Sequence, residues 1–443
     1  MIDKILDLIS NHQFTEVRYI LENTNVVDIA EMLDELSDEN ALRVFRLMPK
    51  EAAAETFSYM YKDSQQKIVE AITDRELSGI MDELFLDDTV DLIEEMPANV
   101  VKKVLANTSG EKRKLINHFL QYADDSAGSV MTIEFVDLKK EMTVSEAFER
   151  IRKIGINKET IYTCYVIDQN RKLEGIVTVK TLLLSESGDI IGDIMDINVI
   201  FSYTDDDKES IANTFSKYDI LSLPIVDKEK RLVGIITIDD AIEVLQEVTT
   251  EDFEIMAAVT PSDEPYLKTG AWTHAKNRIV WLTVLMFSAM FTGGIIINFQ
   301  SSFEAVPVLV AFIPMLMNTG GNCGSQVSTL VIRGMALGEI QGHHVLRVWW
   351  KEICVSVIVG AALALLNFLR ILWFDNSATL ALTVSVSLYV TVILSKSVGC
   401  LLPIAAKQVG LDPAIMASPI ITTIVDACTL LVYFSFASLV MQL

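Results

Sequence analysis

A single carboxylate, Asp426, lies near the middle of the last apolar stretch of the chain, residues 413–440. That stretch is long enough to cross a bilayer, which takes about 20 apolar residues. An aspartate at the centre of a spanning helix costs about 3 kcal/mol on insertion scales, so such residues usually line an ion or proton pathway. Lys396 is the only intramembrane cation available to neutralise it, unless its long side chain extends to the membrane surface instead. The alternative is a buried aspartate satisfied by hydroxyl groups of a neighbouring helix.

Two amide side chains, Asn322 and Gln326, are four residues apart in an earlier apolar segment and would share one helix face. Amides inside a membrane require water, a partner helix or an ion. The neighbouring Gly320, Gly321 and Gly324 also suit close helix packing, which is the structural alternative for this segment.

The elements that must position these side chains are five predicted membrane spans, at about 278–298, 304–333, 350–373, 379–406 and 413–440. Positive charge falls on the loops of one side, at Lys276, Arg278, Arg333, Arg347, Lys351 and Lys407. The positive-inside rule then predicts a multi-pass plasma-membrane protein with a cytoplasmic N-terminus and an outside C-terminus. Pro314 and Pro419 lack an N–H group, so we expect them to disturb their helices and free carbonyl oxygens.

Charge is distributed unevenly, since 54 of the 60 acidic residues precede residue 276 and the net charge is −24. The first part of the chain should therefore attract cations and should not bind nucleic acid. Five scattered cysteines form neither a disulfide framework nor a zinc spacing. The first residues do not resemble a signal peptide, which favours a cytoplasmic location for the acidic part.

Residues 1–125 are expected to form an all-helical domain, because apolar residues recur at spacings of three and four between polar or proline turns. Residues 39–49 resemble residues 87–97 at an offset of 48, which indicates two helical hairpins of about 24 residues each. Such units favour a stacked superhelix, with an ordinary helical bundle as the alternative.

Residues 126–248 contain a clearer duplication, because residues 166–178 match residues 225–237 at an offset of 59. Each copy is predicted to fold as strand, polar turn, strand and helix. This pattern resembles a tandem pair of cystathionine-β-synthase (CBS) domains. In such domains a Gly-x-x-Thr-x-x-Asp motif often contacts an adenosine ribose, and the second copy has it as Gly234, Thr237 and Asp240. The first copy ends in Thr181 instead of aspartate, so ATP is a candidate ligand of the second copy only.

An acidic segment, residues 243–275, is predicted to connect this pair to the first span. Glu243, Glu247 and Glu251 are spaced by four and share a helix face. Like charges at that spacing destabilise a helix by a few tenths of a kcal/mol per pair, and a bound cation would reverse the effect. The segment is therefore either a sensor of divalent cations or a solvated acidic face.

With these residues in view, the whole chain resembles the MgtE family of magnesium channels and transporters. The specific parts are the run from Asn318 to Gln326 and the spacing from Asp412 to Asp426. The resemblance implies a multidomain fold with the following parts: a superhelical N-domain at 1–125, an α/β tandem CBS pair at 126–248, a connecting or plug helix at 243–275, and a transmembrane domain of five helices at 276–443.

The resemblance also implies a homodimer whose central pore holds a hydrated Mg²⁺ beside Asp426, with Thr422 and Ser418 one and two turns earlier. The family's cytosolic sensor acids match Glu55, Asp87, Asp91, Glu209, Asp219, Asp240, Glu243, Glu251, Asp252 and Asp412. A position that is often acidic in the connecting helix is Val248 here, which puts the number of sensor ions in doubt.

The sequence thus predicts a Mg²⁺-selective channel or facilitator for magnesium uptake, closed by cytosolic Mg²⁺. One alternative is a carrier for Mn²⁺ or Co²⁺, with or without proton coupling. Another is a membrane receptor or enzyme regulated through the CBS pair. The sequence contains no nucleophile–base pair, P-loop or His-rich metal site, so we expect no enzymatic activity.

Overall fold

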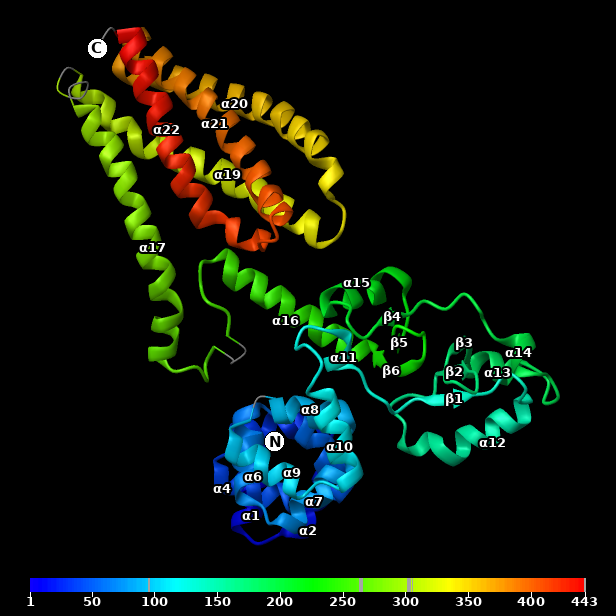
Figure 1. The fold of residues 1–443 in the computed structure, drawn as a ribbon. Helices are drawn as coiled ribbons and strands as arrows, with labels where there is room; N and C mark the ends of the chain where they lie inside the picture. The colour runs from blue at the N-terminus through cyan, green and yellow to red at the C-terminus, as the bar shows by residue number, and fades with distance from the viewer. Residues whose placement is uncertain (95, 263–265, 301–303, 305, 442–443) are drawn as a thin grey trace. The chain divides into compact units, whose positions relative to one another are not determined.

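The computed structural model describes residues 1–94, 96–262, 266–300, 304 and 306–441 (Figure 1). The chain divides into two compact units, Met1–Leu245 and Gln246–Leu443. The first unit holds a helical repeat followed by two α/β copies, and the second is built from long helices.

The described part of residues 1–119 holds ten short helices. They are α1 (Ile2–Ser10), α2 (Phe14–Glu22), α3 (Val26–Glu35), α4 (Asp38–Phe45), α5 (Lys50–Ser58), α6 (Lys62–Ala71), α7 (Asp74–Glu83), α8 (Leu86–Glu94), α9 (Ala98–Ala106) and α10 (Gly110–Phe119). Helices α1, α3, α5, α7 and α9 begin 24 residues apart, and α3, α5, α7 and α9 pack in succession. The predicted hairpin repeat is confirmed, and its packing is that of a stacked superhelix.

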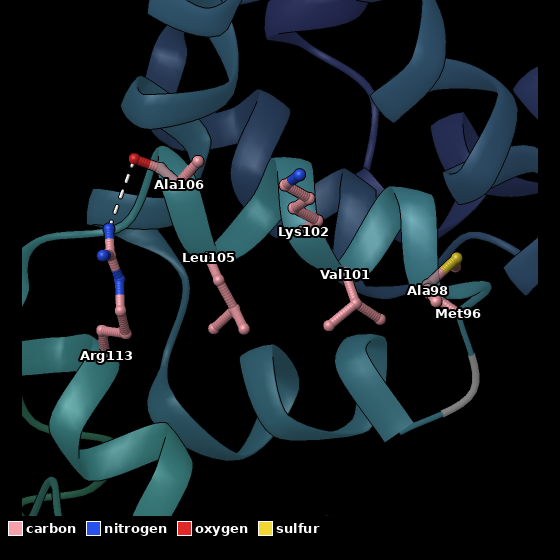
Figure 2. A pocket seen from close by; sticks show the side chains of 7 residues that line it. All are labelled: Met96, Ala98, Val101, Lys102, Leu105, Ala106 and Arg113. Carbon is pink, nitrogen blue, oxygen red and sulfur yellow. Dashed lines mark hydrogen bonds between the residues drawn. The ribbon is translucent and has the colours of Figure 1, made fainter.

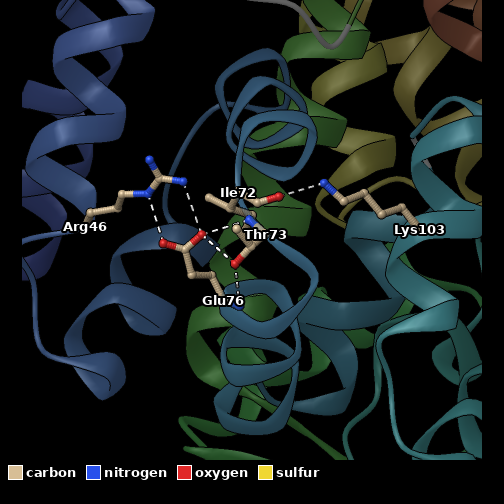
Figure 3. A network of polar contacts seen from close by, with 5 residues as sticks. All are labelled: Arg46, Ile72, Thr73, Glu76 and Lys103. Carbon is tan, nitrogen blue, oxygen red and sulfur yellow. Dashed lines mark hydrogen bonds and ion pairs between the residues drawn. The ribbon is translucent and has the colours of Figure 1, made fainter.

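Polar contacts join the end of α4 to α7 and the end of α6 to α9, so each of them spans one intervening hairpin (Figure 3). The Thr73 backbone N–H donates to Glu76, which completes the capping box that starts α7, and Arg46 donates to both carboxylate oxygens at 2.9 and 3.2 Å. These contacts lower the pKa of Glu76 to about 2. Lys103 of α9 donates to the carbonyl oxygen of Ile72 at the end of α6, at 2.8 Å. A cation at a helix C-terminus satisfies carbonyl groups that have no helical donor.

The two α/β copies follow the helical repeat. The first contains α11 (Ala127–Val130), β1 (Val136–Leu138), α12 (Val144–Ile154), β2 (Thr163–Ile167), β3 (Leu173–Thr178) and α13 (Val179–Leu184). The second contains α14 (Ile191–Ile194), β4 (Ser202–Tyr203), α15 (Lys208–Tyr218), β5 (Ser222–Val226), β6 (Leu232–Thr237) and α16 (Ile238–Met256). In each sheet a parallel pair is followed by an antiparallel pair, and the two hairpins keep the predicted offset of 59.

The second strand of each hairpin packs on the segment at the start of the other copy. A Cβ at Gly234 would lie 2.7 Å from the Thr132 carbonyl oxygen and 2.8 Å from the Met131 sulfur. Likewise, a Cβ at Gly175 would lie 2.8 Å from the Met195 sulfur. Both glycines are therefore required for this reciprocal packing, which also explains the similar methionines at the start of each copy.

The predicted connecting helix is shorter than residues 243–275. Helix α16 begins directly after β6 and ends at Met256, and Ala258 has a positive φ of 55°. The next helix, α17, runs over Ala271–Asn298. A left-handed residue one position past the C-terminal cap commonly ends a helix, so the helical prediction fails beyond Met256.

The second unit continues with 3₁₀ turn η2 (Pro307–Phe312), α19 (Ile313–Ala336), η3 (Gly342–His344), α20 (Val345–Asp375), α21 (Ala378–Gln408), η4 (Pro413–Met416) and α22 (Ser418–Met441). Helices α19, α21 and α22 pack on one another, α20 packs on α21, and α17 packs on α22 (Figure 1). A core of buried apolar side chains, including Leu316, Leu388 and Tyr433, lies among them.

Among the described residues, four stretches are long and apolar enough to cross a membrane: Ala271–Asn298, Gly342–Phe374, Ala378–Gln408 and Pro413–Met441. Helix α19 has 24 residues and covers most of the second predicted span, but it is not among the four. Its asparagine, glutamine, serine and glycine residues lower its hydropathy. The count of five spans therefore stays a prediction.

The two prolines do not disturb their helices as predicted. Pro314 is the second residue of α19, and Pro419 is the second residue of α22. The first turn of a helix has no internal acceptor for its N–H groups, so a proline there removes no hydrogen bond. The prediction that these prolines disturb their helices is wrong, and the prediction of free carbonyl groups beside them stays a prediction.

Candidate functional site

Asp426 lies on α22 with a half-buried side chain. Throughout the part of the chain that the structure describes, no basic side chain pairs with this carboxylate. Lys396, the predicted neutralising cation, is paired elsewhere, because its Nζ lies 3.9 Å from Glu352 Oε2. Asp426 therefore stays an uncompensated acid among apolar helices, and such residues usually serve an ion pathway.

The predicted neighbours of Asp426 lie toward the start of α22. Thr422 is one turn earlier, and its hydroxyl donates to the Pro419 carbonyl oxygen at 3.0 Å. Ser418 begins the helix, and its side chain lies outside the described residues.

The glycines of α19 make the close helix contacts that the structural alternative predicted. A Cβ at Gly321 would lie 2.6 Å from the Thr422 methyl carbon, and one at Gly324 would lie 2.7 Å from Ile421. A Cβ at Gly320 would lie 2.9 Å from both Thr391 and Thr429. Helix α19 therefore packs closely against both α21 and α22.

The amides of α19 lie on a different face from these contacts. Asn318, Asn322 and Gln326 are exposed on one stripe, and the Asn322 amide lies 3.4 Å from the Asn318 oxygen. A stripe of amides facing lipid would be unfavourable, so this face needs water, an ion or a partner helix. In the segment from Asn318 to Gln326, the glycines thus form the packing face and the amides form a separate, exposed face.

Three hydroxyl groups beside α19 were not anticipated from the sequence. Thr391, Ser395 and Thr429 are each 1% exposed, and within the described residues their oxygen atoms have no hydrogen-bond partner. Serine and threonine are ordinary helix-contact residues in membranes, so the residue types alone gave no signal.

The second candidate site is a group of acids in the first unit, contributed by α8, by the start of α16 and by the loop after α12. Asp87 is 8% exposed, and burial followed by the neighbouring Asp88 raises its pKa well above its ordinary value. Burial and Asp240 raise the pKa of Asp88 to about 7. Burial, Asp240 and Asp239 raise the pKa of Glu159 to about 8. These acids share burial and mutual repulsion.

Little positive charge offsets this group. Burial lowers the pKa of Lys112, whose ammonium group donates to the carbonyl oxygens of Met81 and Leu84 at the end of α7. Burial raises the pKa of Asp240 to about 6, although Asp240 accepts two hydrogen bonds from Thr237 that favour the carboxylate. A divalent cation would relieve both the repulsion and the cost of burial.

The predicted sensor acids divide into two sets. Asp91 and Glu243 interact electrostatically with members of the group. Burial, followed by Glu55, raises the pKa of Tyr59, which Asp88 and Glu159 raise as well. The remaining acids lie elsewhere: Glu209 in the first turn of α15, Asp219 at its C-terminal cap, Glu251 and Asp252 in the last turns of α16, and Asp412 at the N-cap of η4. Among residues 1–94, 96–262, 266–300, 304 and 306–441, no three histidine, cysteine or acidic side chains are arranged to hold a metal ion.

Sequence reasoning missed two members of the acidic group, Asp88 and Glu159. Asp88 directly follows a predicted sensor acid, and its backbone N–H donates to Asp87 at 3.0 Å. Glu159 lies between α12 and β2, where the first copy has five more residues than the second copy has between α15 and β5. An alignment of the two copies that included their first helices would have revealed this insertion.

The predicted nucleotide motif is engaged in internal contacts. Gly234 packs on Thr132, and Asp240 Oδ2 accepts from the Thr237 backbone N–H and hydroxyl at 3.0 and 2.6 Å. The first copy replaces this cap with a hydroxyl contact of 2.9 Å between Thr178 and Thr181. The motif therefore caps the helix after β6, and a ribose would have to compete with that cap.

A groove of about 630 Å³ on α9 shares no lining residue with either site (Figure 2). It is lined by Met96, Ala98, Val101, Lys102, Leu105, Ala106 and Arg113. Arg113 donates to the carbonyl oxygen of Ala106 at 3.3 Å. None of the described lining residues is acidic, so they offer a cation no carboxylate.

The fold and the two sites define a multi-pass membrane protein in which an acidic unit with a CBS pair precedes apolar helices. Family models match along the chain: the MgtE intracellular N domain over residues 24–125, the CBS domain over 127–187 and 191–247, and the MgtE divalent cation transporter over 313–436. The chain is 34% identical to magnesium transporter MgtE of Thermus thermophilus, over 96% of this chain and 95% of that protein. It is 29% identical to magnesium transporter MgtE of Bacillus subtilis, over 95% of each. The chain belongs to the MgtE family.

Two crystal structures are similar to the first part of the chain. One is described as the cytosolic domain of the Mg²⁺ channel MgtE in complex with ATP, with 31% identity, a TM-score of 0.53, and coverage of 55% of this chain and 100% of that one. The other is described as the soluble part of a magnesium transporter, with 26% identity, a TM-score of 0.53, and coverage of 56% and 97%.

Proposed function

We propose that this protein is a Mg²⁺-selective channel or facilitator for magnesium uptake, closed by cytosolic Mg²⁺. The observation that carries the proposal is Asp426, an acid without a basic partner among the described residues of an apolar helix bundle. The named activity of the relatives from Thermus thermophilus and Bacillus subtilis supports Mg²⁺ as the transported ion. Mg²⁺ dehydrates reluctantly and keeps several waters, so one acid beside hydroxyl and amide oxygens suits it.

The proposed pathway consists of Asp426, Thr422, Ser418, Asn322 and Gln326. In a homodimer with the pore on its axis, two copies of Asp426 would neutralise one divalent ion. The exposed amide stripe of α19 supports this arrangement, because a second copy would remove the amides from lipid. A weak, hydrated site also permits release, which conduction requires.

The proposed topology has five spans, with α19 as the second, a cytoplasmic N-terminus and an outside C-terminus. A lipid-facing helix as polar as α19 would be disfavoured, but a helix that lines a water-filled pore is not. We retain the division into residues 1–125, 126–248, 243–275 and 276–443, with α16 as the helical part of the connecting segment.

For the gate, we propose that Mg²⁺ bridges the acidic surfaces of the N-domain, the CBS pair and the connecting segment. The ligands would be Glu55, Asp87, Asp91, Glu209, Asp219, Asp240, Glu243, Glu251, Asp252 and Asp412. High internal Mg²⁺ would join these surfaces and close the pore, and low Mg²⁺ would let like charges separate them. A ligand shifts such an equilibrium only by its different affinity for the two states, and bridging sites that exist only in the closed state supply that difference.

ATP is a second proposed ligand, at Gly234, Thr237 and Asp240. The structure described as a complex with ATP supports it. The bonds from Thr237 to Asp240 oppose it, because a ribose would have to displace them.

The test is Mg²⁺ influx into liposomes that contain the purified full-length protein and an enclosed Mg²⁺-sensitive dye. We expect influx at low internal Mg²⁺ and its suppression as internal Mg²⁺ rises, with protein-free liposomes as the control. Faster influx of Mn²⁺ or Co²⁺ would favour the carrier alternative, and a dependence on a pH gradient would favour proton coupling. Absence of influx for every ion would leave the receptor or enzyme alternative.

A further inference from the structure

An ion pair lies inside the apolar helices of the second unit. Lys396 of α21 and Glu352 of α20 are 3.9 Å apart between Nζ and Oε2, and their side chains are 7% and 18% exposed. Both residues lie within stretches that are long and apolar enough to span a membrane. Neither residue belongs to the proposed ion pathway.

A buried pair of this kind is sensitive to the loss of one partner. Removing either side chain leaves the other charge uncompensated in a low-dielectric environment, whereas replacing both by neutral groups avoids that penalty. The pair therefore acts as a directional constraint between α20 and α21. It specifies one rotation of α21 about its axis, because Lys396 reaches Glu352 only from the face that it occupies.

The same region of α21 supports α19. Gly399 lies three residues after Lys396, and a Cβ there would overlap the carbonyl group of Gly324 in α19. In return, a Cβ at Gly324 would lie 3.3 Å from the Ser395 carbonyl oxygen. The backbones of α19 and α21 are thus in direct contact one turn from the ion pair, so a rotation of α21 must displace α19.

Helix α19 carries that displacement to the proposed pathway. Gln326 is two residues from Gly324, and Asn322 is two residues from it on the other side. Gly321 of the same helix contacts Thr422, with a distance of 2.6 Å from its would-be Cβ. These glycine contacts are close-packed, so a shift of one helix must move its neighbour.

We propose that Glu352 and Lys396 form a positioning pair that fixes the rotation of α21 and thereby the amide face of α19. Through that face the pair sets the rate of transport and the discrimination between divalent ions. This inference rests on the proposed function, since it assigns the pair to the same pathway.

The test compares full-length variants in liposomes: Glu352→Gln, Lys396→Gln, the double variant E352Q/K396Q, and the exchanged pair E352K/K396E. The matched control is Lys351→Gln, which removes an exposed charge one residue away on α20. For each variant we would measure the maximal Mg²⁺ influx per folded protein, the half-saturating Mg²⁺ concentration and the ratio of Mg²⁺ to Co²⁺ influx.

We expect each single variant to lose roughly tenfold in maximal influx and to change its Mg²⁺ to Co²⁺ ratio, with the double variant closer to the unmodified protein. The exchanged pair should recover most of the ratio, because opposite charges again face each other. Lys351→Gln should match the unmodified protein in all three quantities.

Three results would overturn the inference. One is single variants whose folded fraction transports at the unmodified rate and ratio, which would reduce the pair to a folding contact. Another is a double variant and an exchanged pair that are both no better than the singles, because this would mean that the charges do not act as a pair. If the unmodified protein itself moves no ion, the proposed function fails, and this inference fails with it.

Discussion

The acids of the two units differ in what surrounds them. In the second unit Asp426 has no basic partner among the described residues, and Lys396 is paired with Glu352. In the first unit Asp87, Asp88 and Glu159 are crowded, because burial raises the pKa of each and neighbouring acids, Asp240 among them, raise it further. A lone acid favours a cation without holding it firmly, whereas crowded acids gain most when a cation joins them. The comparison supports the proposal that the second unit conducts the ion and that the first unit detects it.

The largest expected effect comes from Asp426→Asn, which removes the lone acid. We predict about a hundredfold loss of Mg²⁺ influx, equivalent to about 2.7 kcal/mol, because the pathway loses its only charge. Thermal stability should stay the same or rise, since an unpaired acid in an apolar helix is costly. Influx and thermal unfolding of the purified protein measure the two effects.

The matched control for this variant is Glu339→Gln, which neutralises an exposed acid of the same unit. It should leave both influx and stability unchanged. A loss of stability in Asp426→Asn together with normal influx would contradict the view of Asp426 as a pathway residue.

The second effect concerns the proposed detection of internal Mg²⁺ by the acidic group of the first unit. Asp87→Asn should raise the internal Mg²⁺ concentration that halves influx by about tenfold, because the closed state loses one bridging ligand. Maximal influx at very low internal Mg²⁺ should change little, since the pathway is intact. The measurement is influx into liposomes loaded with a series of Mg²⁺ concentrations.

Asp82→Asn provides the control, because Asp82 is an exposed acid on the neighbouring helix α7. Identical Mg²⁺ sensitivity in Asp87→Asn and the unmodified protein would exclude Asp87 from detection.

The sequence predicts repeated local patterns well. The 24-residue hairpins and the duplicated α/β copies follow from periodicity and from offsets that recur along the chain. Asp426 could also be identified from the sequence alone, because an acidic residue within an apolar stretch is unusual wherever its partners lie.

Features that depend on residues far apart in the chain could not be predicted from the sequence. The pairing of Lys396 with Glu352 joins two helices, and no spacing within either helix indicates it. The stripe of Asn322 and Gln326 was predicted, but its separation from the glycine contacts depends on where α21 and α22 pack. The end of α16 depends on the left-handed conformation of a single residue, Ala258. Alanine rarely adopts a positive φ, so the residue type does not predict this conformation.

A third effect is the pH dependence of α8 in the absence of Mg²⁺. The raised pKa values of Asp88 and Glu159, about 7 and 8, mean that the folded state binds more protons than the unfolded state does. Their contribution to stability is full below the ordinary carboxyl range and is lost as pH rises through 7 to 8. We predict that the free energy of opening α8 falls by about 1–3 kcal/mol between pH 5 and pH 8.

Hydrogen exchange of α8 in the full-length protein, corrected for intrinsic rates, measures this change. Asp88→Asn should reduce the slope, Asp82→Asn should not, and added Mg²⁺ should flatten the slope by favouring the charged carboxylates. Protection that increases with pH in the absence of Mg²⁺ would show that the acids are not crowded in the folded state.

The smallest effect concerns the glycine contacts that place α19 beside Asp426. Gly321→Ala puts a methyl group 2.6 Å from the Thr422 methyl carbon, so a few-fold loss of influx and about 1 kcal/mol of stability are expected. Gly293→Ala on α17 meets no atom within 4 Å and should be neutral or slightly stabilising. Equal behaviour of the two variants would remove the argument for close packing at Gly321.

The most direct test of the contrast between the two units is a structure of the full-length protein determined once with Mg²⁺ and once with a chelator. With Mg²⁺, density for a hydrated ion should lie on the Asp426 carboxylate, next to the Thr422 oxygen, and it should disappear with the chelator. An Asp426 side chain that points into a dry contact between helices, with the same density in both conditions, would contradict the account.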